Sequence, residues 1–405
     1  MEQIKKAEKM NRVHSDIRGP VFEEANRMRK NGIEVVRLNT GNPAVFGFGL
    51  PESVRKAVTE NLDGAVAYCD LRGMPAARQA IYEYHKGKGL PNINETDIFI
   101  GNGVSELVPM ALQPLLDPGD EVLIPCPDYS LWTNAVHLCG AKPVHYICDE
   151  QSNWYPDLAD IRAKITPKTR ALLVINPNNP TGAVYPEEIL LQLADIAREH
   201  DLVLFADEIY DRLVMDGVKH TSIASLCPDL FCVTFNGLSK SHIVCGFRVG
   251  WMIMSGNLEK GRDYIAGMQQ IAAMRLCANA IMQPAIPAAL ADPESTNAML
   301  VPGGRLYEQR EACCRVLDTI EGLTYVKNHA AFYIFPKLDV KKFNITDDQK
   351  FAFDFLHEKH VMIIPGRGFS WPDPDHFRIV MLPEPALMEE SMRRLGDFLK
   401  TYRQD

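Results

Sequence analysis

Short apolar runs alternate with longer amphipathic stretches between about residues 95 and 255. The runs lack the polar alternation of a half-exposed strand, so they predict strands that are buried on both faces. The intervening stretches, such as 105–116, 129–138 and 186–199, are long enough for crossover helices. The predicted strands are 97–100, 121–125, 143–147, 171–175, 202–206, 231–235 and 249–254. This order predicts an α/β large domain with a mostly parallel, seven-stranded sheet covered by helices.

The pattern changes beyond about residue 295. A long helix is predicted at 302–320, and later helices at 351–358 and 385–402. Between them, short apolar runs predict strands at 323–326, 331–335, 361–364 and 377–380. We therefore expect three parts: an N-terminal arm (1–44), a large domain (45–295) and a small α+β domain (296–405). The arm is too short for a domain, and we expect it to pack on the small domain or on a partner subunit.

Composition narrows the functional classes. A formal net charge of −9 argues against general affinity for nucleic acid or anionic membranes. The basic N-terminus lacks the apolar region of a signal peptide, and no apolar run reaches the ~18 residues of a membrane span. The ten cysteines form no CxxC pair, which favours reduced thiols and a cytoplasmic protein. His357 and His360 stand three apart, so they do not form the HExxH zinc motif, and we expect no metal site.

Polar residues follow several of the predicted strands. Because ligands bind beyond the carboxyl ends of the strands in open α/β sheets, these residues are the first candidates for a site. Residues 176–182 (NPNNPTG) follow one strand, and their prolines and glycine predict a fixed turn. The turn presents Asn179 as an amide donor to a cleft, although an ordinary loop has the same composition.

Asp207 ends another predicted strand and begins the tetrapeptide DEIY, which also contains Tyr210. A buried carboxylate is costly to desolvate unless a cation or a hydrogen-bond donor meets it. Aspartate is also a common N-cap of helices. The position alone therefore leaves both interpretations open.

Ser239 and Lys240 follow the strand 231–235, and Arg248 comes eight residues after Lys240. Burial and nearby cations lower the pKa of a lysine, which suits Schiff-base chemistry. The guanidinium fork of Arg248 matches a phosphate. These three residues predict a covalent site beside an anion site.

Residues 101–105 (GNGVS) follow the first predicted strand and open a helix. Glycines let the backbone approach a ligand closely, and the free amides of Gly103, Val104 and Ser105 attract an anion. The segment is neither a full dinucleotide motif nor a P-loop, so a single phosphate fits it better.

These segments together resemble the class I and II aminotransferases, which are pyridoxal 5'-phosphate (PLP) enzymes of fold type I. GNGVSE, PNNPTG, DEIY, SK and FR occur in the family's order along most of the chain. Residues 16–20 (DIRGP), 41–43 (GNP) and 274–279 (MRLCAN) most resemble the alanine aminotransferases, particularly the bacterial glutamate–pyruvate type. The resemblance implies a fold type I PLP-dependent transferase that acts on amino acids and 2-oxo acids. It also implies a homodimer with shared active sites.

The resemblance implies a task for each site residue. Lys240 holds PLP as a Schiff base and moves protons at the substrate α-carbon, Asp207 keeps the ring nitrogen protonated, and Tyr210 donates to the ring oxygen. The implied cofactor-binding residues are Gly103, Val104, Ser105, Tyr129, Asn179, Asp207, Tyr210, Ser239, Lys240 and Arg248, with Tyr68 reaching the phosphate of the neighbouring subunit. The implied substrate-binding residues are Gly41, Asn179, Arg378 and Arg18.

Only a few residues bear on which substrate the protein binds. We expect Arg18 to bind the distal carboxylate of glutamate and to move aside for alanine, unless it forms a structural ion pair in the arm. Ser15 stands where alanine-type relatives commonly carry tyrosine, and Gly237 stands where some relatives place a phosphate-binding serine. Arg275 is offset by one from the second-carboxylate arginine of aspartate aminotransferases, so it receives no such role. Aminotransferases for other neutral amino acids (valine, aromatic) and PLP β-lyases remain alternatives.

Overall fold

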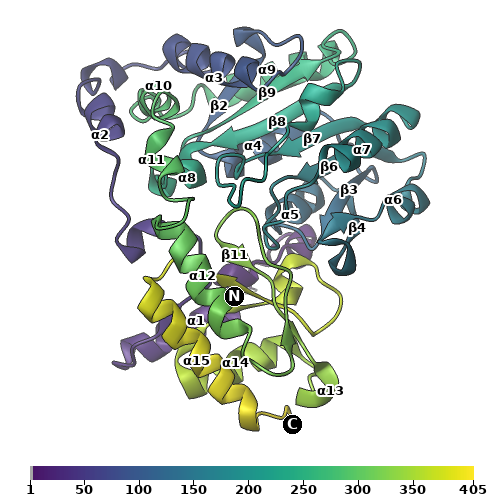
Figure 1. Ribbon diagram of the computed structural model, residues 1–405. Coiled ribbons are helices and arrows are strands. Elements are labelled where there is room, and N and C mark those ends of the chain that lie inside the picture. Colours follow the sequence, from purple (N-terminus) through teal and green to yellow (C-terminus); the bar gives the residue numbers. More distant parts are fainter. Residues whose placement is uncertain (1–2) are drawn as a thin grey trace.

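The protein is described by a computed structural model of residues 3–405, which contain one large sheet and three small ones (Figure 1). All seven predicted strands are present in the large sheet. In spatial order the sheet consists of β2 (Ile98–Gly101), β9 (Gly250–Gly256), β8 (Phe231–Gly237), β7 (Val203–Asp207), β6 (Thr169–Ile175), β3 (Glu121–Cys126), β4 (Lys142–Asp149) and β5 (Tyr155–Pro156).

The sheet is mostly parallel, as predicted, but it has eight strands and not seven. The strands from β8 through β4 run parallel, whereas β9 is antiparallel to both of its neighbours. The additional strand, β5, pairs antiparallel with the end of β4 and contains only two residues. A pair of residues is too short to produce a hydrophobic pattern, which explains why the sequence did not predict it.

Helices cover both faces of the large sheet, and the side chains of each strand alternate between them. In β6, Leu172 and Val174 belong to one apolar core, whereas Leu173 and Ile175 belong to the other. The first core contains residues of α3 (Pro75–Gly87), α6 (Leu158–Lys164), α7 (Glu187–Glu199) and α10 (Ala285–Leu290). The second contains residues of α4 (Val104–Leu112), α5 (Leu131–Leu138) and α9 (Arg262–Arg275). Burial on both faces is why the strands are continuously apolar.

The C-terminal part forms the small sheets and packs beyond the carboxyl ends of the large sheet (Figure 1). Its strands are β10 (Leu323–Thr324), β11 (Tyr333–Ile334), β12 (Lys337–Leu338), β13 (Val361–Met362), β14 (Ile364–Pro365) and β15 (Phe377–Val380). Its long helices are α12 (Arg305–Leu317), α14 (Asp348–Lys359) and α15 (Pro385–Thr401). Its short helix is α13 (Val340–Phe343), and the short helices α2 (Glu52–Thr59), α8 (Leu238–Ser241) and α11 (Glu294–Asn297) occur earlier in the chain.

The N-terminal arm lies against the C-terminal part. Its helix α1 (Pro20–Lys30) contacts α14, and its strand β1 (Val36–Arg37) pairs parallel with β13. The three-part division at residues 44/45 and 295/296 stays a prediction. Within residues 3–405, every helix is too short or too polar to cross a lipid bilayer.

Candidate active site

A cavity of about 910 Å³ lies where the carboxyl ends of the sheet strands face the arm and the small sheets. It is lined by the turns that follow β2, β6, β7 and β8, together with Tyr333 on β11 and Arg378 on β15. Four cations and one carboxylate line the cavity: Arg18, Lys240, Arg248, Arg378 and Asp207. The cavity is therefore locally positive in a chain of net charge −9, which suits an anionic ligand.

Asp207 is the last residue of β7 and is buried. One carboxylate oxygen accepts a hydrogen bond from Trp132 Nε1 at 3.0 Å, and the other accepts one from the Ile209 amide at 3.3 Å. Burial outweighs both hydrogen bonds and raises the pKa of Asp207 to about 6. No helix follows this position, so the N-cap interpretation was wrong: Asp207 is a buried acid facing the cavity.

Trp132 and Tyr333 are site residues that sequence reasoning missed. Trp132 lies on α5 and packs edge-on against Phe235, which aims its indole N–H at Asp207. Tyr333 accepts a hydrogen bond from Tyr210 Oη at 3.0 Å. Both contacts join distant parts of the chain, and neither residue belongs to a local motif. Tyr129 lies just before α5 and lines the cavity.

Arg378 is a buried cation whose protein partners are neutral. Its Nη1 donates to Asn179 Oδ1 at 2.9 Å, and its Nη2 donates to the carbonyl of Asn39. The buried Nε has no partner, and burial lowers the pKa of the guanidinium. Over residues 3–405, neither Arg378 nor Asp207 forms an ion pair. The cavity thus carries one buried charge of each sign that no ion pair within these residues compensates.

The turn after β6 holds Asn179 because its other polar residues bond to one another. Asn178 Oδ1 accepts from Thr181 Oγ1 at 2.8 Å, and Asn176 Oδ1 accepts from the Tyr185 amide at 2.9 Å. Asn179 alone of these three asparagines lines the cavity. The ordinary-loop interpretation does not account for that placement.

Lys240 lies on α8, immediately after β8. Its Nζ donates to the carbonyl of Gly41 at 2.9 Å and lies 5.8 Å from the ring centre of Phe332. Gly41, predicted to contact substrate, is therefore next to the predicted covalent lysine. A side chain at Gly41 would collide with Tyr333 and Phe332.

The residues predicted to bind a phosphate lie in the cavity at and near the start of α4. Val104, Ser105, Ser239 and Arg248 line the cavity together. Gly103 has a φ of +84°, and a Cβ there would lie 2.4 Å from Nη2 of Arg248. The backbone and the guanidinium thus approach as closely as a glycine permits, forming a cradle of amide and guanidinium donors.

Two departures noted in the sequence have structural explanations. A Cβ at Gly237 would lie 2.6 Å from the Val249 carbonyl, because Gly237 pairs with Gly250 in the sheet. Arg275 donates to Glu106 at 2.8 Å and to the Leu71 carbonyl at 3.0 Å, and it does not line the cavity. Arg275 therefore braces the β2–α4 turn.

Arg18 and Ser15 from the arm both line the cavity, next to the segment that contains Gly41. Tyr68 is the one predicted site residue in 3–405 that lies apart: it is 80% exposed and does not line the cavity of its own chain.

The residues present fit PLP. A buried carboxylate without a cation matches a protonated ring nitrogen, the cradle at α4 matches a phosphate, and Lys240 lines the same cavity. The class of protein defined by this fold and site is the PLP-dependent enzymes of fold type I.

Comparison with known proteins gives the family. The family model described as aminotransferase class I and II matches residues 33–395, and the chain belongs to this family. The chain is 50% identical over 404 residues to glutamate-pyruvate aminotransferase AlaA of Escherichia coli K12, covering 100% of both chains. It is 47% identical over 397 residues to alanine aminotransferase of Mycobacterium tuberculosis, covering 98% of this chain and 92% of the relative. The structure of alanine aminotransferase from Pyrococcus furiosus superposes with a TM-score of 0.93 at 37% identity, covering 98% of this chain and 100% of that one. The predicted family, fold and cofactor are confirmed.

Proposed function

We propose that this protein is an alanine aminotransferase that moves the amino group between alanine and 2-oxoglutarate in a ping-pong reaction, forming pyruvate and glutamate. The observation that carries the proposal is that one cavity contains two buried charges without an ion pair within residues 3–405. Asp207 is the acid for the cofactor ring, and Arg378 is the cation for the substrate carboxylate. The relatives named glutamate-pyruvate and alanine aminotransferase support the choice of substrate.

Bound PLP supplies an electron-accepting ring, and the protein supplies orientation and proton transfer. Lys240 carries the cofactor and moves a proton at the substrate α-carbon. Asp207 holds the proton on the ring nitrogen, and Tyr210 and Asn179 orient the ring oxygen. Arg378 binds the substrate α-carboxylate, because its fork of donors matches that group and its Nε lacks a partner.

Arg18 distinguishes the two substrates in this proposal. It lines the cavity without an ion pair among residues 3–405, which leaves its charge available for the distal carboxylate of glutamate. Ser15, a residue with a small side chain, lines the same cavity. Within the described residues 3–405, no ion pair supports the structural alternative for Arg18.

A homodimer with shared sites is supported by an exposed apolar region. Val66, Tyr68, Met274 and Leu276 are 88%, 80%, 82% and 52% exposed. Arg275 bonds to the Leu71 carbonyl, so the two segments lie side by side. Apolar residues gathered at one place favour a protein interface, and we infer that Tyr68 serves the site of the partner subunit. A cytoplasmic location fits the free thiols of the ten cysteines.

The test is a half-reaction with purified protein that carries PLP. Alanine alone should convert the visible spectrum of the cofactor and release one pyruvate per site without ammonia, and 2-oxoglutarate should then restore the spectrum. Lys240→Ala is the control and should do neither. Faster conversion by valine or an aromatic amino acid would favour a broader neutral aminotransferase, and ammonia from cystathionine would favour a β-lyase.

A further inference from the structure

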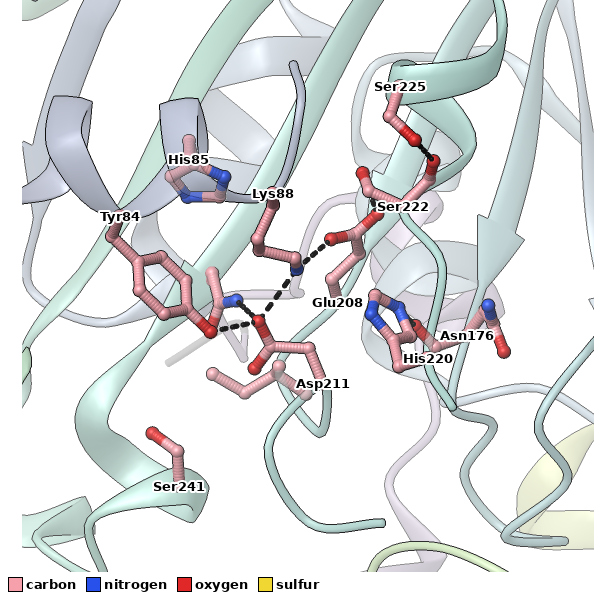
Figure 2. Close-up of polar contacts among 12 residues, drawn as sticks. Tyr84, His85, Lys88, Asn176, Glu208, Asp211, His220, Ser222, Ser225 and Ser241 are labelled. Atoms are coloured by element: carbon pink, nitrogen blue, oxygen red, sulfur yellow. Dashed lines mark hydrogen bonds and ion pairs between the residues drawn. The ribbon is translucent and has the colours of Figure 1, made fainter. Parts of the chain in front are cut away.

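Lys88, Glu208 and Asp211 form a buried ionic cluster (Figure 2), and its two carboxylates belong to the same turn as Asp207 and Tyr210. Lys88, the residue that follows α3, donates to Glu208 Oε2 at 2.7 Å and to Asp211 Oδ2 at 2.8 Å. The Lys88 side chain is 17% exposed, and those of Glu208 and Asp211 are 2% and 1% exposed. Burying three charges carries a large desolvation cost, and such clusters are a weak source of stability. Stability alone therefore does not account for this cluster.

The turn from Asp207 to Asp211 presents its side chains to two sides. Asp207 and Tyr210 line the cavity, whereas Glu208 and Asp211 point to Lys88. The turn is short and internally bonded, because the Asp211 amide donates to the Glu208 carbonyl at 3.0 Å. A displacement of either carboxylate would therefore move the neighbouring cavity residue.

The cluster also reaches the strand that precedes Lys240. Asn236 Nδ2, at the end of β8, donates to Asp211 Oδ2 at 2.8 Å, and Tyr84 Oη on α3 donates to the same oxygen at 2.5 Å. Ser222 Oγ donates to Glu208 Oε1 at 2.5 Å. The ends of β7 and β8, which carry the acid and the lysine of the site, are thus joined through one carboxylate.

Lys88 supplies the positive charge of this cluster. Burial disfavours its ammonium, but the attraction of Asp211 and Glu208 outweighs burial and raises the pKa of Lys88. Burial also disfavours the charged forms of Glu208 and Asp211. The attraction of Lys88 outweighs this effect of burial and lowers the pKa of both carboxyl groups. The neighbouring imidazoles do not share this task, because burial lowers the pKa of His85 to about 3 and also lowers that of His220.

We propose that Lys88 is a positioning residue that holds, through Glu208 and Asp211, the turn placing Asp207 and Tyr210 in the active site. Lys88 does not line the cavity, so it acts only through the turn. The inference rests on the proposed function, since it assigns Asp207 and Tyr210 to the cofactor.

The experiment compares holoenzyme of wild type, Lys88→Met and Lys88→Arg. Met keeps the length of the side chain and removes its charge, and Arg keeps the charge. We expect Lys88→Met to lower kcat on the order of 10- to 100-fold, because small misplacements of catalytic groups have effects of that size. The KM for alanine should stay within about threefold, because Arg378 is untouched. Lys88→Arg should recover most of the lost kcat.

Two readouts do not depend on turnover. The visible circular dichroism of bound PLP should change in Lys88→Met, and PLP should leave the holoenzyme faster on dilution. Lys164→Met is the matched control, since Lys164 also pairs with a partly buried carboxylate, Asp160 at 2.7 Å, but on α6. The control should keep the wild-type circular dichroism and kcat.

A lower melting temperature in Lys88→Met with unchanged kcat, circular dichroism and PLP release would overturn the proposal. If Lys88→Met does not fold, Glu208→Gln decides, because it keeps the shape of the side chain and leaves Asp211 paired with Lys88. It should change the circular dichroism of PLP and lower kcat several-fold, and wild-type values for both would overturn the proposal. Failure of wild type to transaminate alanine would instead count against the proposed function, while the cofactor readouts would still test Lys88.

Discussion

At the scale of single residues, the site holds charges that the protein itself does not neutralise. Asp207 lacks a cation and Arg378 lacks an anion within the described chain, although both are buried. Each group costs stability in the free protein and gains a partner only when a ligand binds. Function and stability therefore oppose each other at these two positions.

The variant Asp207→Asn tests whether the carboxylate that serves function lowers the stability of the cofactor-free protein. The pKa of Asp207 rises from 3.8 to about 6 on folding. The folded cofactor-free protein thus holds the proton more tightly than the unfolded chain, and the stability that this contributes is lost as the pH rises from about 4 to about 6. At pH 7 we expect the cofactor-free variant to be more stable than wild type, by up to about 3 kcal/mol. It should nevertheless bind PLP more weakly.

The measurements are urea unfolding of the cofactor-free proteins at pH 4 and pH 7, and PLP titration at pH 7. The advantage of the variant should shrink at pH 4, where wild-type Asp207 is also protonated. An equal difference in stability at both pH values would contradict the assigned protonation of Asp207.

Arg18→Ala tests the choice between substrates. We expect kcat/KM for glutamate to fall roughly tenfold, because one cation–carboxylate contact is lost, and kcat/KM for alanine to change less than about threefold. Arg12→Ala is the control, since Arg12 belongs to the same arm but does not line the cavity. Equal losses for alanine and glutamate would show that Arg18 has no selective role.

At the scale of elements, the site depends on the turns that follow the carboxyl ends of the strands. The turns after β2, β6, β7 and β8 meet at one edge because these strands point the same way, with β9 inserted in the opposite direction between β2 and β8. Two close approaches are part of this arrangement: the backbone of Gly237 lies against the backbone of β9, and the backbone of Gly103 lies against the guanidinium of Arg248.

Gly103→Ala tests the turn between β2 and α4. The new Cβ would collide with the guanidinium of Arg248 and would also occupy a φ of +84°. We expect PLP to bind roughly tenfold more weakly or worse, because the phosphate donors are displaced. Gly119→Ala is the matched control: its φ is +95°, but nothing lies within 4 Å of the new Cβ. The control should lose about 1 kcal/mol of stability and keep PLP affinity. Equal PLP affinity in both variants would contradict the cradle.

At the scale of the whole molecule, the predicted site residues lie in or next to one cavity of a single chain except Tyr68, which is 80% exposed and does not line that cavity. A second subunit placed on the exposed apolar region around Tyr68 would cover Val66 and Met274 as well. Symmetry then requires that each chain give and receive one Tyr68.

Hybrid dimers test this exchange. In a heterodimer of Lys240→Ala and Tyr68→Ala chains, one site keeps both Lys240 and Tyr68 of the partner subunit, so about half of the wild-type activity per dimer is expected. A heterodimer of wild type with the Lys240→Ala/Tyr68→Ala double variant has no such site and should be less active. The measurement is kcat per dimer after separation by two affinity tags, and equal activities of the two hybrids would exclude a shared site.

The sequence by itself determined the strands, the order of the motifs and hence the chemistry. Buried parallel strands are apolar throughout, and a turn at a strand end is encoded by adjacent residues, so Asn179, Asp207 and Lys240 were candidates from their local context. The order of the motifs and the resemblance to the family then implied their roles. A two-residue strand such as β5 leaves no such pattern.

Only the tertiary structure decided which distant side chains complete the site. Trp132 meets Asp207 across 75 residues, Lys88 meets Glu208 across 120, and Tyr210 meets Tyr333 across 123. These contacts arise because helices and small strands pack over the sheet edge, and the pairing of particular distant residues leaves no periodic signal in the chain. The local sequence therefore specified the reacting groups, while the fold supplied the partners that set their charge and position.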